Sequence, residues 1–246
     1  MKPLYLTDSY LIEWDAAVES VNGRHVTLEE SAFYPAGGGQ PCDFGKISCN
    51  GTSYNVVNVT KAGIEVDKEG LKAGDNVRCS IDWQRRYSLM RMHTAAHMLI
   101  AVICEEYSSS RSQRSNASLQ MYNEGKVLVT GNQLDVEKSR IDFSMEDMNR
   151  QKIDECFEKV NEFVRQDIPV TFTFMQRDEV LKHKHLAKLA VGLPDIQEFR
   201  ILKIGDLDEQ ADGGTHVMST KEIGRIVLLS IENKGKLNRR VYYTVE

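Results

Sequence analysis

The feature that most constrains this chain is a long stretch of helical periodicity over residues 84 to 106. Apolar side chains recur there at three- and four-residue intervals, which predicts a helix with one buried stripe. The stripe consists of Leu89, Met92, Ala96, Leu99, Ile100 and Ile103. His93 and His97 lie beside it, one helical turn apart on the same face. Two imidazoles placed in this way can hold one metal ion, but they can equally be ordinary helix histidines with locally satisfied ring nitrogens.

The composition is that of an ordinary globular protein, with 41% hydrophobic and 27% charged residues. It excludes the fibrous and disordered classes. A length of 246 residues suits one large domain or two smaller ones, and we expect two. The N-terminus lacks the apolar run of a signal peptide, and no window approaches the roughly 18 apolar residues of a membrane span. We therefore expect a cytoplasmic protein with no membrane partner.

The cysteines and the net charge further restrict the classes of protein to which this chain can belong. The five cysteines are scattered and never form a Cys-x-x-Cys pair, so we expect reduced, mostly structural thiols. A net charge of -5 argues against nonspecific coating of nucleic acid, which rests on many Lys and Arg contacts to phosphates. Local contacts to phosphates remain open, although each basic residue can equally be a solvated charge. The candidates are Arg85, Arg86, Arg91, Arg111, Arg114 and residues 234–240.

Residues 11 to about 82 show short strand-like runs separated by tight turns. Asn22-Gly23 and Asn50-Gly51 each stand between two such runs, which is the pattern of a two-residue hairpin. Many short strands with regular turns predict a small closed or nearly closed β-barrel. We expect this barrel domain to cover residues 1–84 and a second domain to cover residues 85–246.

One loop in the first domain differs from the others. Residues 31–41 read Ser-Ala-Phe-Tyr-Pro-Ala-Gly-Gly-Gly-Gln-Pro. The successive glycines Gly37, Gly38 and Gly39 permit positive φ and close approach of the backbone to another surface, and the flanking prolines stiffen the loop. The loop can equally be a merely flexible turn. Its spacing matches neither a P-loop nor a dinucleotide-binding fingerprint.

Beyond the long helix, strand-like and helical stretches are mixed without strict alternation. The strand-like stretches are residues 117–122, 126–130, 140–143, 169–174, 199–204, 226–231 and 241–243. One helix is predicted from an imperfect capping signal at Ser144 and Asp147 to just before Pro169, and another over residues 177–189. This mixture predicts an α+β fold with two layers, in which helices cover one face of an antiparallel or mixed sheet.

A metal at His93 and His97 needs further ligands, and the best candidates lie in the segment from Asp212 to His216. Its two glycines predict a tight loop that can turn a carboxylate and an imidazole toward one point. His93, His97, Asp212 and His216 would together supply nitrogen and oxygen donors suited to zinc. A zinc protease would carry Glu after the first histidine as general base, but Thr94 stands there, so that class is excluded.

Taken together, these segments resemble the editing domain of alanyl-tRNA synthetases and its free-standing relatives, the AlaX trans-editing proteins. The resemblance covers nearly the whole chain, and its matching pieces are residues 33–40, 93–97, 140–143, 213–217, 220–224 and 234–240. The barrel and the glycine loop are similar to the longer AlaX class. The resemblance implies ATP-independent, Zn²⁺-dependent hydrolysis of seryl-tRNA(Ala), a step in translation fidelity. Glycyl-tRNA(Ala) remains open as a further substrate.

The resemblance also implies roles for individual residues. The catalytic set would be His93, His97 and Gln40, and the metal ligands would be His93, His97, Asp212 and His216. The substrate-binding set would be Ser31, Gly37, Gly38, Gly39, Gln40 and Thr215. Two positions depart from the family pattern. Asp212 replaces the usual cysteine ligand, which we expect to lower zinc affinity because oxygen is a harder donor than thiolate. Ser31 replaces the threonine that normally precedes the glycine loop.

The partner implied is the acceptor end of tRNA(Ala) carrying serine. A pocket built for alanine rejects an isostere with one added hydroxyl by only about 10²-fold, so a second site that hydrogen-bonds the serine hydroxyl is needed. Ser31 and Gln40 are the candidates, and Gln40 can both donate and accept. Three alternatives stay open: whether zinc activates water or anchors the substrate, whether the chain is instead a catalytically silent binding module, and whether it is a monomer or a homodimer.

Overall fold

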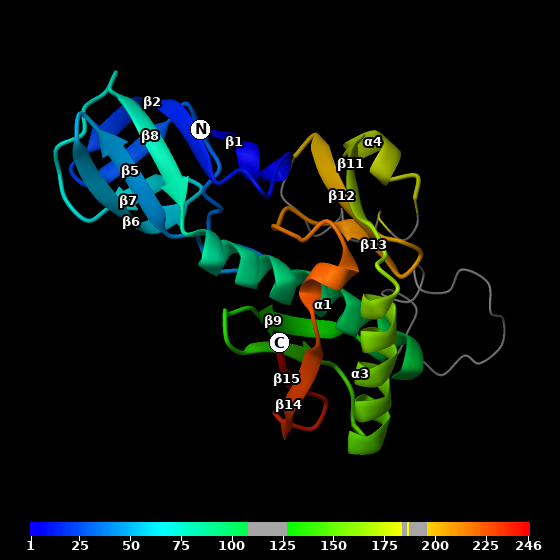
Figure 1. Ribbon diagram of the computed structural model, residues 1–246. Coiled ribbons are helices and arrows are strands. Elements are labelled where there is room, and N and C mark those ends of the chain that lie inside the picture. The colour runs from blue at the N-terminus through cyan, green and yellow to red at the C-terminus, as the bar shows by residue number, and fades with distance from the viewer. Residues whose placement is uncertain (108–126, 184–185, 187–195) are drawn as a thin grey trace. The chain divides into compact units, whose positions relative to one another are not determined.

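A computed structural model describes residues 1–107, 127–183, 186 and 196–246 of the chain. The chain divides into two compact units, residues 1–90 and 91–246. The division falls inside the long helix α1, Trp83–Tyr107, which matches the helix predicted over residues 84–106 (Figure 1). The domain boundary expected between residues 84 and 85 falls inside the same helix, and it stays a prediction. No helix among the described residues is both long and apolar enough to cross a membrane.

The first unit is a closed barrel, as predicted. Its strands, in sequence order, are β2 (Glu13–Asn22), β3 (His25–Leu28), β5 (Gly45–Cys49), β6 (Thr52–Thr60), β7 (Gly63–Val66) and β8 (Asn76–Ile81). They close in the order β2-β3-β7-β6-β5-β8. Both predicted two-residue hairpins are present: Cys49 pairs with Thr52 around Asn50-Gly51 as predicted, whereas Asn22 pairs with His25, so the first turn lies at positions 23 and 24, one residue later than predicted. Inward-facing residues of these strands form one continuous apolar core.

Short elements precede and interrupt the barrel. Strand β1 (Lys2–Pro3) pairs in parallel with β4 (Glu30–Ser31), and a 3-10 turn, η1 (Leu4–Leu6), follows β1. The glycine loop lies between β4 and β5.

The second unit contains α1 and two antiparallel sheets. The four-stranded sheet has the order β14-β15-β10-β9, and the three-stranded sheet has the order β11-β12-β13. The strands are β9 (Val129–Gln133), β10 (Ser139–Phe143), β11 (Val170–Gln176), β12 (Glu198–Ile204), β13 (Asp208–Ala211), β14 (Ile226–Asn233) and β15 (Arg239–Val245). The other helices are α3 (Arg150–Arg165), α4 (Arg177–Val180) and the 3-10 helix η3 (Thr220–Ile223). Helices and antiparallel sheets in one unit confirm the α+β class.

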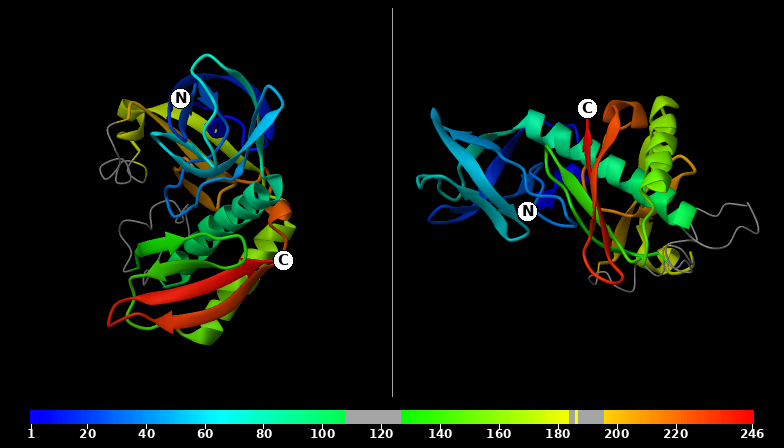
Figure 2. Two further views of the ribbon diagram at one scale, coloured as in Figure 1. Left: turned by 90° about the vertical axis from the view of Figure 1, so that its left-hand side faces the viewer. Right: turned by 90° about the horizontal axis from the view of Figure 1, so that it is seen from below.

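Helix packing in the second unit follows from a few specific contacts. Helix α3 packs against β14 (Figure 2). The Asn161 side chain donates to the Ile226 carbonyl and accepts from its N–H, each at 2.8 Å. The Tyr243 hydroxyl of β15 donates to the Met92 carbonyl of α1 at 2.9 Å. Every residue of α1 from 92 to 104 is buried, so the helix is covered well beyond the single stripe that its periodicity predicted.

Several predicted boundaries in this unit are wrong. Helix α3 begins after Asn149, whose side chain accepts from the Lys152 N–H, and not at the capping signal predicted at Ser144. Asn ranks with Ser as an N-cap, so composition alone cannot choose between them. Helix α4 ends at Val180, and residues 181–183 are not helical, which interrupts the helix predicted over 177–189; residue 186 is helical again, and the other positions of that range lie outside the described residues. The strand predicted over 117–122 also lies outside them, and β13 was not predicted.

Candidate metal centre

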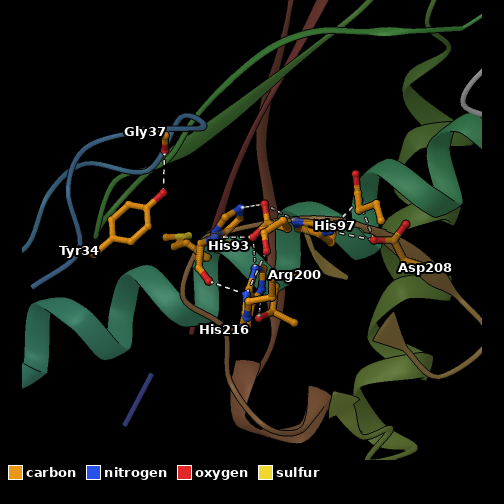
Figure 3. Close-up of polar contacts among 12 residues, drawn as sticks. Tyr34, Gly37, His93, His97, Arg200, Asp208 and His216 are labelled. Carbon is orange, nitrogen blue, oxygen red and sulfur yellow. Dashed lines mark hydrogen bonds and ion pairs between the residues drawn. The ribbon is translucent and has the colours of Figure 1, made fainter. Parts of the chain in front are cut away.

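Four side chains from two distant segments meet in the second unit. His93 and His97 come from α1, and Asp212 and His216 come from the loop after β13. One potential ligand atom from each lies within 4.8 Å of all the others. The three imidazoles are buried, and Figure 3 shows them facing one another. The residues predicted as a ligand set are therefore neighbours in space.

The loop is shaped by Asp212 and its glycine. The Gly214 N–H donates to Asp212 Oδ1 at 2.6 Å, and His216 Nε2 lies 2.9 Å from the same oxygen. A Cβ atom at Gly214 would lie 2.2 Å from His93 Cε1, so a side chain larger than hydrogen cannot fit without moving the ring or the loop. The buried Arg200 of β12 also holds the loop, since its Nη1 donates to the carbonyls of Asp212 at 3.2 Å and Gly214 at 3.0 Å.

Partners outside the ligand set orient two of the imidazoles. His97 Nδ1 lies 2.8 Å from Asp208 Oδ2, and Gln210 Nε2 lies 2.7 Å from that same carboxylate oxygen. His216 Nδ1 lies 3.1 Å from Thr94 Oγ1. With each Nδ1 engaged in this way, the Nε2 atoms of His97 and His216 face Asp212. Metal-binding histidines are commonly oriented by such hydrogen bonds at the other ring nitrogen.

The sequence interpretation missed Asp208 and Gln210. Both lie on β13, and Asp208, Gln210 and Asp212 alternate along the chain, so they face the same side of an extended strand. The alternation Asp-x-Gln-x-Asp was visible in the sequence. This alternation did not lead to a prediction for Asp208 and Gln210, because no strand was predicted at these positions.

The charges of the cluster are tightly coupled. Burial lowers the pKa of His216 to about 4, and burial together with the neighbouring imidazoles holds the pKa of His93 well below its ordinary value. Burial also acts to lower the pKa of His97, but hydrogen bonds to the carboxylates of Asp208 and Asp212 outweigh it and raise that pKa to about 10. Burial acts to raise the pKa of Asp212, yet the nearby histidines hold it well below its ordinary value.

The donor set fits a zinc ion. Three imidazoles and one carboxylate are the donors of a tetrahedral zinc site, and two of the imidazoles already have an outer partner. The lowered pKa values of His93, His216 and Asp212 favour the neutral imidazoles and the carboxylate that ligands require, whereas the raised pKa of His97 means that its Nε2 must give up a proton when a metal binds. These four residues would hold the metal.

The glycine loop of the first unit contains a tight, hydrogen-bonded turn. The Gly37 N–H donates to the Gln40 carbonyl at 3.0 Å, and the Gln40 N–H donates to the Gly37 carbonyl at 2.9 Å. Between them, Gly38 and Gly39 have φ of 59° and 87°, a conformation that few other residues adopt. The Tyr34 hydroxyl also donates to the Gly37 carbonyl at 3.0 Å (Figure 3).

A buried ion pair fixes the flanks of this loop. The Arg86 Nε atom lies 3.0 Å from each carboxylate oxygen of Asp43, and both side chains are fully buried. Arg86 Nη2 also donates to the Ala32 carbonyl at 2.6 Å, and Asp43 accepts from the Tyr34 N–H at 2.6 Å. Arg86 is therefore a buried structural residue, which fits neither of the two roles left open for it, a phosphate contact or a solvated charge.

The remaining predicted residues are placed as follows. Ser31 is buried, and its Oγ accepts from the Phe33 N–H at 3.2 Å, a contact that leaves the hydroxyl proton available as a donor. Thr215 is buried in the loop from Asp212 to His216, which we call the metal loop. Arg91 donates to the Ile223 and Glu246 carbonyls, which engages its guanidinium inside the second unit. Two further candidates for phosphate contact lie outside the described residues: Arg111 and Arg114.

Comparison with known proteins agrees with this architecture. The family described as "Threonyl and Alanyl tRNA synthetase second additional domain" matches residues 199–242, which include the metal loop. The family described as "tRNA synthetases class II (A)" matches residues 10–85, which include the barrel.

Similarity to whole proteins is more extensive. The chain is 39% identical to the alanyl-tRNA editing protein AlaX-M of Methanosarcina barkeri, over 98% of each chain. It is 37% identical to AlaX-M of Saccharolobus solfataricus, over 99% of this chain and 98% of that protein. It is also 33% identical to the alanine–tRNA ligase of Pyrococcus abyssi, where 94% of this chain matches only 24% of the ligase. The chain belongs to the AlaX-M family of alanyl-tRNA editing proteins.

Proposed function

We propose that this protein is a cytoplasmic, zinc-dependent deacylase that hydrolyses seryl-tRNA(Ala), with the metal held by His93, His97, Asp212 and His216. Family membership makes the chain an aminoacyl-tRNA deacylase. The observation that carries the metal assignment is the convergence of four ligand atoms within 4.8 Å, with His97 and His216 each oriented by an outer partner.

A bound zinc ion would supply Lewis acidity at the aminoacyl ester, either by activating a water or by anchoring the substrate. Neighbouring residues of the chain orient the candidate ligands and supply their charge. Asp208 holds His97 Nδ1, which keeps Nε2 available as a ligand. Asp212 carries the negative charge of the donor set, and Thr94 fixes the ring of His216.

Selectivity for serine is assigned to the first unit. We infer that Ser31 and Gln40 hydrogen-bond the serine hydroxyl, so that an alanyl ester would leave buried polar groups unpaired and be rejected by about 10⁴-fold. The tight turn at Gly37, Gly38 and Gly39 supports this role because it presents Gln40 in one defined backbone conformation. Thr215 would contribute to substrate binding from the metal loop.

The direct test uses seryl-, glycyl- and alanyl-tRNA(Ala), incubated with metal-free protein and with protein reloaded with zinc. We expect zinc-dependent release of serine and sparing of alanine. Release of serine by metal-free protein would contradict the metal role. No release at any metal loading would favour a catalytically silent tRNA-end-binding module.

The His97→Ala variant provides the matching site test. We expect it to lose bound zinc and deacylase activity together. The control is His25→Ala, which removes an exposed histidine from β3 of the barrel. Full activity of the His97→Ala protein without bound metal would refute the assignment.

A further inference from the structure

The three-stranded sheet of the second unit has two unlike faces. One face is apolar and packed, where Phe199 and Ile201 cluster with Val180 and Leu186. On the other face Phe172 and Phe174 of β11 are 37% and 41% exposed. Their rings meet edge to face, with centroids 5.8 Å apart. Two neighbouring exposed phenylalanines on an edge strand are unusual for a surface that has no partner.

The exposed pair shares its sheet face with residues that support the metal centre. In the strand register Phe174 pairs with Arg200, Phe172 pairs with Leu202, and Leu202 pairs with Gln210. Directly paired residues project to the same face of a sheet. Gln210 in turn contacts Asp208, which holds His97. The aromatic pair and the outer partners of the metal centre therefore line one continuous face.

Arg200 connects the aromatic pair to the metal loop directly. Its Cζ atom lies 4.4 Å from the centroid of the Phe172 ring, and its Nη1 donates to the Asp212 and Gly214 carbonyls at 3.2 and 3.0 Å. Only one side chain thus separates the ring of Phe172 from a loop that supplies two of the four ligands.

We propose that Phe172 and Phe174 form a stacking platform for the unpaired bases at the 3′ end of the tRNA substrate, a proposal that rests on the deacylase function assigned above. The scissile ester lies on the terminal ribose, so the last bases must lie within a nucleotide or two of the metal centre. Unpaired bases are bound by stacking on aromatic side chains, assisted by arginine. The guanidinium of Arg200 is buried and donates to the metal loop, so its part in the platform is to hold the Phe172 ring through a cation–π contact.

The alternative occupant is a second copy of the chain, which could add a strand to the exposed edge of β11. The nucleic-acid end is favoured because the exposed feature is a pair of rings next to a cation and the metal loop. Pairing at a strand edge would need only main-chain groups.

The test compares the Phe172→Ala/Phe174→Ala protein with the wild type, both full-length and zinc-loaded. The double variant loses two base stacks, so we expect KM for seryl-tRNA(Ala) to rise about 30-fold or more, with kcat and zinc content nearly unchanged. The Phe172→Tyr/Phe174→Tyr variant should keep the wild-type KM. The Phe172→Leu/Phe174→Leu variant should show a raised KM, because leucine keeps the apolar area but lacks an aromatic face for stacking. Leu229→Ala, on the exposed part of β14, is the matched surface control.

A second measurement uses uncharged tRNA(Ala) and the same tRNA without its last three nucleotides. We expect truncation to weaken binding to the wild type but to leave binding to the alanine variant unchanged. Equal KM values in the two proteins, with truncation weakening both equally, would overturn the platform. A wild-type dimer that becomes monomeric in the variant while tRNA binding is retained would assign the surface to a second copy. If the wild type releases no serine at all, the proposed function fails, and the tRNA-binding comparison still decides the platform.

Discussion

His97 Nδ1 and Asp208 Oδ2 lie 2.8 Å apart, although 111 positions separate the two residues in the sequence. Gln210 donates to the same carboxylate oxygen, so Asp208 is itself held in place. A carboxylate that accepts from Nδ1–H fixes the tautomer of an imidazole and increases its basicity as a ligand at Nε2. Asp208 therefore supports the candidate metal site without being one of its four candidate ligands.

The first prediction concerns this outer contact. Asp208→Asn should weaken zinc binding about 10- to 100-fold, because the amide is a weaker acceptor and cannot polarise the ring as a carboxylate does. Competition with a chelator measures the zinc affinity. Glu209→Gln, the adjacent position on β13, is the control. Unchanged affinity in the Asp208→Asn protein would show that the contact does not tune the site.

The second prediction concerns Gly214. A methyl group there would lie 2.2 Å from His93 Cε1, an overlap that only movement of the ring or the loop can relieve. Gly214→Ala should therefore fold but bind less than one equivalent of zinc, as measured by metal analysis after dialysis. Gly131→Ala is the control, since a Cβ atom added at Gly131 would lie 3.4 Å from the Asp142 carboxylate, an ordinary contact distance. Full zinc occupancy in the Gly214→Ala protein would contradict the packing argument.

The third prediction concerns the donor at position 212. Asp212→Cys should bind zinc more tightly than the wild type and discriminate more strongly against hard cations, because thiolate is a softer ligand than carboxylate. Cobalt substitution checks this: a thiolate-to-cobalt charge-transfer band should appear only in the variant. Asp212→Ala should lose metal. A cobalt spectrum of the Asp212→Cys protein without that band would place residue 212 outside the ligand set.

The fourth prediction concerns pH and Asp142. Arg240 Nε donates to its carboxylate at 2.6 Å, and Arg140 Nη1 donates at 2.6 Å. Burial acts to raise the pKa of Asp142, but the two guanidinium groups outweigh it and lower that pKa. Because the folded-state pKa lies below the unfolded-state value, the carboxylate contributes stability above the unfolded-state pKa, and this contribution is lost as pH falls through the folded-state pKa.

Asp142→Asn should accordingly lower Tm near neutral pH, and its difference from the wild type should shrink below about pH 4. Thermal denaturation across this range measures the difference. Asp154→Asn serves as the control, since it alters an exposed ion pair with Arg150 on α3. A constant difference in Tm at every pH would show that the effect is not electrostatic.

The fifth prediction concerns the buried pair in the first unit. Asp43→Asn should destabilise the protein by about 3–5 kcal/mol, because it leaves the buried guanidinium of Arg86 without its counter-charge. Denaturant unfolding measures this. Glu13→Gln, which alters an exposed ion pair with Arg78, should change stability far less, because solvent screens the two charges. Equal effects of the two substitutions would contradict the assignment of Asp43 and Arg86 as the anchor of the loop.

The sequence by itself determined the elements whose signals are local. Helix α1, the two hairpins and the closed barrel follow from periodicity and from Asn-Gly pairs, which act over a few residues. The proximity within each pair of predicted ligands was also foreseeable, whereas the meeting of the two pairs was not. One pair shares a helical face, and the other pair shares a short glycine-containing loop.

Only the tertiary structure decided the contacts between residues far apart in the chain. It showed that Asp208 supports His97, that Arg86 is buried against Asp43, and that the exposed rings of Phe172 and Phe174 lie on the same sheet face as Gln210. The physical reason is common to all three. Whether a charged side chain is solvated or paired, and whether a strand residue faces a neighbour, depends on the register of strands and on packing between segments. Neither of these is encoded in a local pattern.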